Sequence, residues 1–294
     1  MSVSAYLGKR LTDLVAVDEA LRFAALARNK SENDFLQALR SFWMDFPSIS
    51  QGQLDPHSAD YANHWFTVYE ALAGKKYEIK SEGFEFDVEY YSSHPYPLCT
   101  ESPQVVSQHI MAIGHIIGAL SLPPKASILE MGAGWGNTSL ILAQMGYDVT
   151  VVDINRKYGE LIRNRSHGLG VNIQYECLGF DEVLSLGKKF DCVLFFESFH
   201  HSHDHLKLLD IVYLILNSGG ILALAGEPLN ERLPYEWGLN PAGEALWQIR
   251  THGWLELVFR ESYLLKTLQI KGFSVQKHEM HGNPVGTTFV CERY

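Results

Sequence analysis

The sequence contains few cysteines and no long apolar run. Its four cysteines are scattered, without the spacing of a zinc site, at Cys99, Cys177, Cys192 and Cys291. We interpret them as reduced residues of a cytoplasmic protein, two of them inside buried strands. No apolar stretch reaches the roughly 20 residues that cross a bilayer, and the amino terminus lacks a basic segment followed by an apolar core. We therefore expect no membrane partner.

Positive charge is also scarce. The chain has 24 lysines and arginines against 34 aspartates and glutamates, and its net charge is −10. Binding to nucleic-acid phosphates needs a concentrated basic face. This balance argues against a nucleic-acid partner, and the sequence shows neither an internal repeat nor a low-complexity tract.

Apolar residues, by contrast, are plentiful. They make up 46% of the 294 residues, enough for one large domain or a domain with an appendage. From Ser127 onward, strand-like runs alternate with helical patterns, which indicates a parallel α/β sheet. The expected strands are 127–132, 148–153, 171–177, 190–197 and 220–226, and the expected helices are 136–146, 156–167, 204–217 and 256–271. Two more strand-like segments follow at 273–278 and 287–291.

The central feature is a glycine-rich turn between the first of these strands and its helix. Gly132, Gly134 and Gly136 alternate with other residues, and such a turn brings free helix N–H groups close to a ligand. A dinucleotide fingerprint would need a glycine where Asn137 stands. Asp153 ends the next strand, where a carboxylate can accept hydrogen bonds from the ribose diol of either NAD or S-adenosylmethionine.

The pattern Glu-x-Gly-x-Gly-x-Gly at 130–136 resembles motif I of the class I S-adenosylmethionine-dependent methyltransferases. The resemblance implies an α/β, Rossmann-like methyltransferase fold with a seven-stranded, mostly parallel sheet. It also implies that segments 273–278 and 287–291 form the antiparallel hairpin that closes this sheet. The implied cofactor is S-adenosyl-L-methionine.

The same resemblance assigns cofactor-binding residues. Asp153 corresponds to the ribose-binding acid, and Ile154 to the residue that lies against the adenine. The acid usual after the third strand is replaced by Gly179, so either Asp181 reaches in or the backbone of Phe180 makes the contact. The other expected cofactor-binding residues are Glu130, Gly132, Ala133, Gly134, Gly136, Asn137, Thr138 and Glu197.

A histidine-rich segment ends the fourth strand of this series. It contains His200, His201, His203 and His205. One hypothesis makes His200 or His201 the general base for an acceptor hydroxyl, helped by Glu197 or Glu227. A second makes the histidines metal ligands, which we do not favour because adjacent side chains on a turn diverge. A third gives them only a packing role, with Asp204 as the amino-terminal cap of the next helix.

Glu227 ends the fifth strand and faces the same crevice in such a sheet. We expect it to bind an acceptor hydroxyl or to assist as a base, and the alternative is a solvated loop acid. Tyr96, Thr100 and Ser102 are weaker candidates for contact with the cofactor carboxylate or the substrate.

The first part of the chain has a different pattern. We expect helices at 11–28, from Ser31 to Trp43, at 58–73 with Gly74 as the stop, and from Ser102-Pro103 to Leu120. Alternating residues at 84–90 predict a half-buried strand. We divide the chain into a helical substrate segment, 1–121, and a cofactor domain, 122–294, with a lid at 228–255. That insertion holds Trp237, Trp247 and Trp254, and its alternative interpretation is a local hydrophobic cluster.

His94-Pro-Tyr-Pro97, the histidine-rich segment and Gly226-Glu-Pro228 also resemble bacterial methyltransferases encoded beside saccharide or secondary-metabolite pathways. This implies O-methylation of a small polar acceptor. The alternatives are an aminopropyl or other transferase on the same fold, an NAD-dependent dehydrogenase, which Asn137 disfavours, and a non-catalytic cofactor-binding scaffold. The oligomeric state stays open, with a homodimer as one option.

Overall fold

The computed structural model describes residues 8–46, 54–94 and 102–294, which form two compact units. Unit 1 contains the segments Gly83–Glu227 and Leu265–Tyr294. Unit 2 contains the described residues of Val3–Glu82 together with Pro228–Leu264. The division at Glu82 and Gly83 differs from the expected boundary at 121, because the helices at 88–93 and 103–120 pack on other elements of unit 1.

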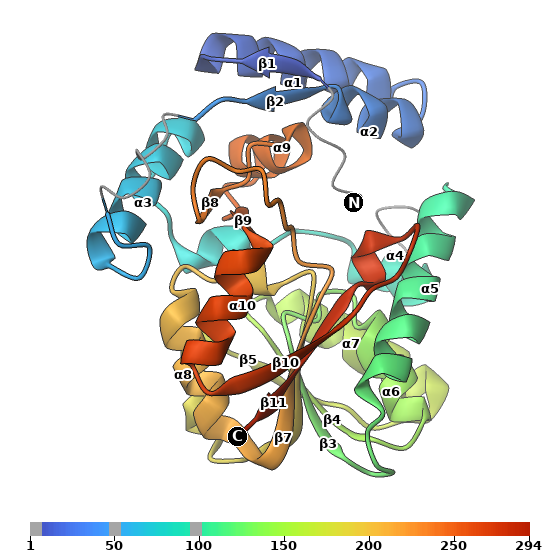
Figure 1. The fold of residues 1–294 in the computed structure, drawn as a ribbon. Coiled ribbons are helices and arrows are strands. Elements are labelled where there is room, and N and C mark those ends of the chain that lie inside the picture. Colours follow the sequence, from blue (N-terminus) through green and yellow to red (C-terminus); the bar gives the residue numbers. More distant parts are fainter. Residues whose placement is uncertain (1–7, 47–53, 95–101) are drawn as a thin grey trace. The chain divides into compact units, whose positions relative to one another are not determined.

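Unit 1 is built on a seven-stranded sheet with the order β10-β11-β7-β6-β3-β4-β5 (Figure 1). Its strands are β3 (Ser127–Met131), β4 (Asp148–Asp153), β5 (Gln174–Cys177), β6 (Phe190–Phe196), β7 (Leu216–Ala225), β10 (Phe273–His278) and β11 (Thr288–Arg293). All neighbours pair in parallel except β11, which runs antiparallel to both β7 and β10. The expected sheet and its closing hairpin are confirmed.

Helices connect the strands and cover them. They are α4 (Val88–Ser93), α5 (Pro103–Leu120), α6 (Asn137–Gln144), α7 (Arg156–Leu169), α8 (His205–Ile215) and α10 (Glu261–Ile270), with the 3₁₀ helices η2 (Phe180–Leu186), η3 (Phe199–His201) and η4 (Pro284–Gly286). Ile116 of α5 packs in one core with Ile128, Val151 and Leu194 of the central strands. These strands are mostly apolar on both faces because the sheet is buried between layers.

The strand order places a topological switch point between β3 and β6. From β3 the chain proceeds to β4 and β5 on one side, and then crosses to β6 and β7 on the other. In open α/β sheets a ligand binds in the crevice at the carboxyl ends of the strands beside such a point. The fold therefore predicts a site formed by the turns after β3, β4, β6 and β7.

Unit 2 combines sequence segments that lie far apart in the chain. Its elements are β1 (Lys9–Leu11), α1 (Leu14–Arg28), α2 (Glu32–Arg40), β2 (Phe42–Met44), α3 (Ala59–Ala73), η1 (Ile79–Glu82), β8 (Trp237–Leu239), α9 (Gly243–Thr251) and β9 (Leu257–Phe259). Arg250 of α9 donates to Asp18 of α1 at 2.7 Å, and the Tyr69 hydroxyl donates to the Gly253 carbonyl at 2.6 Å. The tryptophan-rich insertion thus packs with the amino-terminal helices.

Several element boundaries differ from the sequence expectation. Residues 84–90 do not form a strand: Phe84 and Phe86 pack beside α7, and Asp87 caps α4 by accepting the Tyr90 N–H at 3.1 Å. The helix expected at 256–271 begins only at Glu261, because 257–259 pair with β8 as strand β9. Helix α2 ends at Arg40, and the next residues form β2 against β1.

Cys192 and Cys291 are buried in β6 and β11 as free thiols, while Cys177 is exposed and Cys99 lies outside the described residues. Among the helices of the described segments, none has the length and apolar character that a membrane crossing requires.

Candidate active site

The glycine turn follows β3 and adopts a backbone that only glycine adopts readily. Gly132, Gly134 and Gly136 have φ values of 72°, 49° and 71°. A Cβ on Gly136 would lie 2.5 Å from Cγ1 of Ile162, and one on Gly132 would lie 2.8 Å from Cβ of Ser198. A Cβ on Gly134 would meet no described atom within 4 Å. The turn is therefore packed at both ends and open in its middle.

Asp153 connects this turn to the end of β4. It is 8% exposed, and its carboxylate accepts the Gly134 N–H at 3.1 Å and the Asn155 N–H at 3.0 Å. Burial raises the pKa of Asp153 to about 6, against the lowering effect of these hydrogen bonds. Each carboxylate oxygen has a second lone pair, so Asp153 retains the capacity to accept bonds from a ribose diol.

Glu130 lies below the turn on β3 and is buried. Its carboxylate accepts a hydrogen bond from the Ser139 hydroxyl of α6, and burial raises its pKa to about 7. Glu130 thus fastens α6 to the sheet, where Asn137 and Thr138 form the first residues of the helix. The Ala133 carbonyl accepts the Gly136 N–H at 2.9 Å and closes the turn.

The residues expected to contact the adenine lie in different surroundings. Ile154 is half-buried directly after Asp153, and its carbonyl lies 3.2 Å from the Cys177 thiol. The Phe180 ring would lie 3.2 Å from a Cβ on Gly132, so it borders the turn. Asp181 instead extends toward α8, where its carboxylate is 3.7 Å from Lys207 Nζ. Phe180, not Asp181, is the residue of this pair that the structure brings beside the turn.

Glu227 organises the histidine-rich segment. Its side chain is fully buried, so it is not a solvated loop acid. One carboxylate oxygen accepts the Phe199 N–H at 3.0 Å, and the other accepts both the His200 N–H at 3.0 Å and His200 Nδ1 at 2.8 Å. The Ser198 N–H adds a longer bond of 3.3 Å. This carboxylate holds the η3 turn and the His200 ring together.

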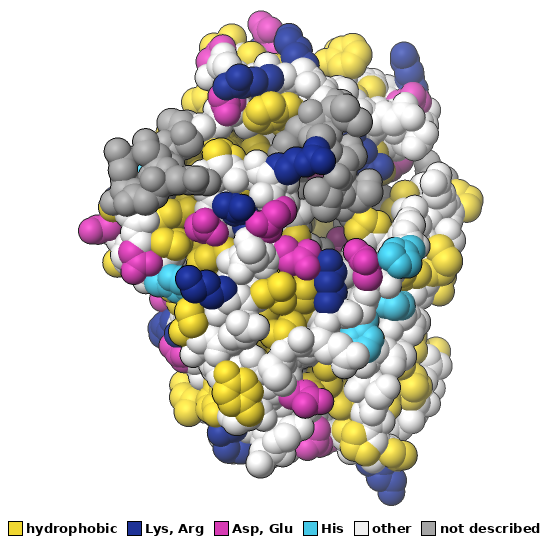
Figure 2. Space-filling model, in the orientation of Figure 1, with side chains coloured by type: hydrophobic (Ala, Val, Ile, Leu, Met, Phe, Trp, Pro, Cys, Tyr) yellow, Lys and Arg dark blue, Asp and Glu magenta, His cyan; other side chains and the backbone are white. Residues whose placement is uncertain are grey.

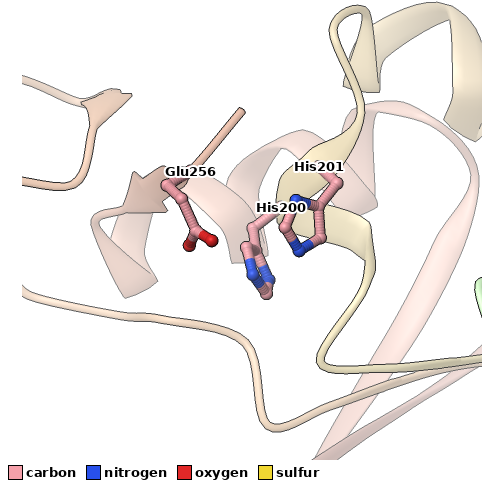
Figure 3. A group of neighbouring side chains, drawn as sticks. All are labelled: His200, His201 and Glu256. Carbon is pink, nitrogen blue, oxygen red and sulfur yellow. The ribbon is translucent and has the colours of Figure 1, made fainter. Parts of the chain in front are cut away.

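The contact fixes the tautomer of His200. An ionised carboxylate only accepts hydrogen bonds, so Nδ1 of His200 must carry the proton. The neutral ring then has its lone pair on Nε2. Figure 3 shows the His200 and His201 rings side by side on η3, with centroids 4.3 Å apart. Glu256, also drawn there, belongs to unit 2, where its carbonyl accepts the Asn240 N–H at 2.8 Å.

The remaining polar residues of the segment have structural contacts. Asp204 accepts the Lys207 N–H at 3.0 Å, which confirms its role as the cap of α8. His205 is buried, and its ring lies edge-on to Phe199 with centroids 6.3 Å apart. His203 is half-buried. Among the described side chains of unit 1, no three His, Cys, Asp or Glu ligands come close enough to hold an ion.

The end of β6 carries residues that the sequence analysis did not single out. Ser198 is buried, and its hydroxyl donates to the Met131 carbonyl at 2.7 Å, joining η3 to the glycine turn. His109 of α5 stacks on Phe196 with ring centroids 5.3 Å apart, and burial lowers its pKa. The signal for His109 was its place on the apolar stripe of α5 that includes Ile113 and Ile116.

Glu197 comes between these groups. It is exposed and has a φ of 51°, which is rare for a residue with a side chain. A Cβ on Gly226 would lie 2.6 Å from Glu197 Cγ, so glycine at 226 leaves the space that Glu197 occupies. Ser102 precedes α5 without a capping side-chain bond, and Tyr96 and Thr100 lie outside the described residues.

The glycine turn also has an aromatic neighbourhood that the motif did not predict. Trp135 packs against Phe86, Tyr91 and Tyr158, with ring centroids 4.7, 4.9 and 5.3 Å away. All four belong to unit 1. The aromatic cluster therefore packs against the turn that contains Gly134.

Part of the chain is similar to known methyltransferases. Residues 128–220 match the family described as Methyltransferase domain. The ubiquinone biosynthesis O-methyltransferase of Paramagnetospirillum magneticum is 31% identical over 55% of this chain and 66% of its own length. The protein-L-isoaspartate O-methyltransferase of Methylorubrum populi is 34% identical over 31% of this chain and 41% of its own length.

A tRNA 5-carboxymethoxyuridine methyltransferase of Escherichia coli is 27% identical over 35% of this chain and 40% of its own length. The chain thus spans less than two thirds of these relatives. Residues 128–220 thus correspond to a methyltransferase domain. The seven-stranded sheet of unit 1, in which β11 runs antiparallel to its neighbours, has the arrangement of the class I methyltransferase fold.

Proposed function

We propose that the protein transfers the methyl group of S-adenosylmethionine to a hydroxyl of a small polar acceptor, with His200 as the general base. The observation that carries this proposal is the 2.8 Å bond between His200 Nδ1 and the fully buried Glu227 carboxylate. A histidine oriented in this way is a common arrangement for drawing a proton from a hydroxyl.

The chain's own residues would bind and align the cofactor. Asp153 accepts the ribose hydroxyls, and the open middle of the turn at Gly134 admits the methionine part close to the backbone. Ile154 and Phe180 border the adenine side. When bound, S-adenosylmethionine supplies an already activated methyl group, so the protein has mainly to orient the acceptor and exclude water.

His200 would then handle the acceptor proton. Its Nε2 accepts the proton as the acceptor oxygen takes the methyl group, and the ring becomes an imidazolium. The Glu227 carboxylate, 2.8 Å from Nδ1, stabilises that positive charge. His201, whose ring centroid lies 4.3 Å from that of His200, is the second candidate for the base.

For the acceptor, we infer a small molecule such as a saccharide or secondary metabolite. The net charge of −10 supports this inference. On the face shown in Figure 2, Lys and Arg side chains are scattered among Asp and Glu and form no continuous basic patch. The three relatives reported above are named for different acceptors: ubiquinone biosynthesis, protein L-isoaspartate and a tRNA uridine.

The test is calorimetry with S-adenosylmethionine and its demethylated product, followed by methyl transfer to matched hydroxyl, amine and carboxyl acceptors. We expect cofactor binding and transfer to hydroxyl groups only. Tight NAD binding without S-adenosylmethionine binding would overturn the assignment. Cofactor binding without transfer to any acceptor in a broad panel would favour a non-catalytic scaffold.

A further inference from the structure

Residues 84–92, which we name the aromatic strap, lie along helix α7 in unit 1. The Asn155 side chain donates to the Phe84 carbonyl at 2.6 Å, and Lys157 Nζ donates to the Phe86 carbonyl at 3.1 Å. Farther along, the Asn164 amide donates to the Ser92 hydroxyl at 3.3 Å. The strap is therefore fixed at three successive points, and one of the three anchors, Asn155, directly follows Asp153 and Ile154 in the chain.

The strap also holds the glycine turn. Phe86 and Tyr91 contact the Trp135 ring, with centroids 4.7 and 4.9 Å away. The Trp135 carbonyl accepts a hydrogen bond from the Arg165 guanidinium of α7. Trp135 is the one large side chain between Gly132 and Gly136. Both its ring and its carbonyl are thus fixed from outside the turn.

This arrangement addresses a physical problem of the motif. Glycine has more backbone freedom than any other residue, so a turn with three glycines loses much entropy when a ligand orders it. Ordering the turn before the ligand arrives removes that cost from binding. Trp135 lies between Gly134 and Gly136 in the chain, so contacts that hold Trp135 also restrain these two glycines.

We propose that the aromatic strap is part of the cofactor site, and that Phe86 is a positioning residue that acts on the cofactor through Trp135. The inference rests on the proposed function, because it takes the ligand of the turn to be the cofactor. Linkage requires the effect to be reciprocal, so an occupied turn stabilises the strap. The strap begins just after Glu82, the last residue of the first segment of unit 2.

The first test is the affinity for S-adenosylhomocysteine, measured by calorimetry. Phe86→Leu removes the flat ring contacts with Trp135 and Tyr158, and we expect roughly three- to tenfold weaker binding. Phe190→Leu is the matched control, because Phe190 is also buried but begins β6, at the end of that strand away from Ser198. We expect wild-type affinity for this control, and near-complete rescue in Phe86→Tyr. Lys157→Met, which removes a strap anchor on a partly exposed side chain, gives a second variant if Phe86→Leu does not fold.

The second test is amide hydrogen exchange. S-adenosylhomocysteine should slow exchange at 84–93 as well as at 132–138 in the wild type, and Phe86→Leu should lose the effect at 84–93. Equal affinity of Phe86→Leu and Phe190→Leu, or unchanged exchange of the strap in the wild type, would overturn the proposal.

The two proposals fail in different ways. If the wild type does not bind S-adenosylhomocysteine, the proposed function is wrong. The strap is then judged without ligand, by whether the Gly134 and Gly136 amides exchange faster in Phe86→Leu than in Phe190→Leu. Equal rates in the two variants would overturn it.

Discussion

Glu227 Oε2 accepts a hydrogen bond from His200 Nδ1 at 2.8 Å, and the same oxygen accepts the His200 backbone N–H at 3.0 Å. The end of β7 thereby fixes both the backbone and the ring of a residue that follows β6. A buried carboxylate that accepts this many hydrogen bonds positions the groups that donate to it. In the proposed reaction, the His200 imidazole and not this carboxylate takes the acceptor proton.

Replacing His200 by alanine should reduce turnover by about 10²–10⁴-fold, since this is the usual contribution of a general base. The affinity for S-adenosylhomocysteine should change little, because the cofactor residues lie on the turns after β3 and β4. Steady-state kinetics and calorimetry measure the two effects. His203→Ala is the control, and an equal loss of cofactor binding in His200→Ala would show a structural role instead.

Glu227→Gln should destabilise the protein by about 1–3 kcal/mol, the cost of an unsatisfied buried polar group. Both oxygens of Glu227 face N–H donors, so the amide nitrogen of glutamine would face a donor in either orientation. Denaturant unfolding measures the loss, and turnover should fall with it because the His200 ring is released. Wild-type stability of Glu227→Gln would contradict this role of the Glu227 hydrogen bonds.

Cofactor affinity should fall below pH 6. Burial raises the pKa of Asp153 to about 6, so acidification in this range removes the charge that accepts the ribose hydroxyls. About a tenth of the Asp153 carboxyl groups stay ionised at pH 5 when the pKa is about 6, so we expect S-adenosylhomocysteine to bind up to about tenfold more weakly at pH 5 than at pH 7.5. Asp153→Asn should bind weakly at both pH values.

The contribution of Asp153 to folding has the opposite sign. Without cofactor, the native state holds a proton on Asp153 that the unfolded chain, with the ordinary value of 3.8, has released. The contribution of Asp153 to the free energy of unfolding is fully present below about pH 4 and is lost as the pH rises through about 6. Comparing denaturant unfolding of the wild type and Asp153→Asn across this range isolates it.

Alanine at Gly134 and alanine at Gly136 should have different effects on the protein. Gly134→Ala places a methyl group in open space, so it should cost only about 1–2 kcal/mol for the left-handed backbone while blocking the cofactor. Gly136→Ala adds a clash with Ile162 and should destabilise the fold more. Thermal unfolding and cofactor calorimetry on both variants separate the two outcomes. Unimpaired cofactor binding in Gly134→Ala would place the ligand elsewhere.

Asp204→Ala tests the capping role. It should cost about 1 kcal/mol of stability, as loss of an amino-terminal cap does, and leave turnover and cofactor affinity unchanged. A drop in activity of the fully folded variant would show that Asp204 has a role beyond the cap.

The central sheet could be predicted from the sequence because its strands are continuous apolar runs, such as 192–196 and 221–225, and its turn needs glycines at fixed places. The alternation at 84–90 misled because period-two burial arises wherever an extended segment lies on a surface. Phe84 and Phe86 have that pattern against α7 without any strand partner among the described residues.

The candidate site was only partly predictable for a related reason. Gly132 and Asp153 are recognised by local spacing, whereas the grip of Glu227 on residues 198–200 joins positions far apart in the chain. The choice between Phe180 and Asp181 depended on Lys207 of another helix, which draws the acid away. His109 required knowledge of which end of α5 lies beside Phe196.

The divided sequence of unit 2 has a consequence for synthesis on the ribosome. Residues 3–82 are made before residues 228–264, so Asp18 and Tyr69 can contact their partners Arg250 and Gly253 only after 83–227 has been synthesised. Domains usually fold from the amino terminus as they emerge. Strands β3, β4, β6 and β7 of unit 1 can therefore pair while the apolar faces of helices α1 to α3 are still exposed to water. We expect unit 2 to complete its fold after these strands have formed, and its amino-terminal helices to need protection from aggregation until then.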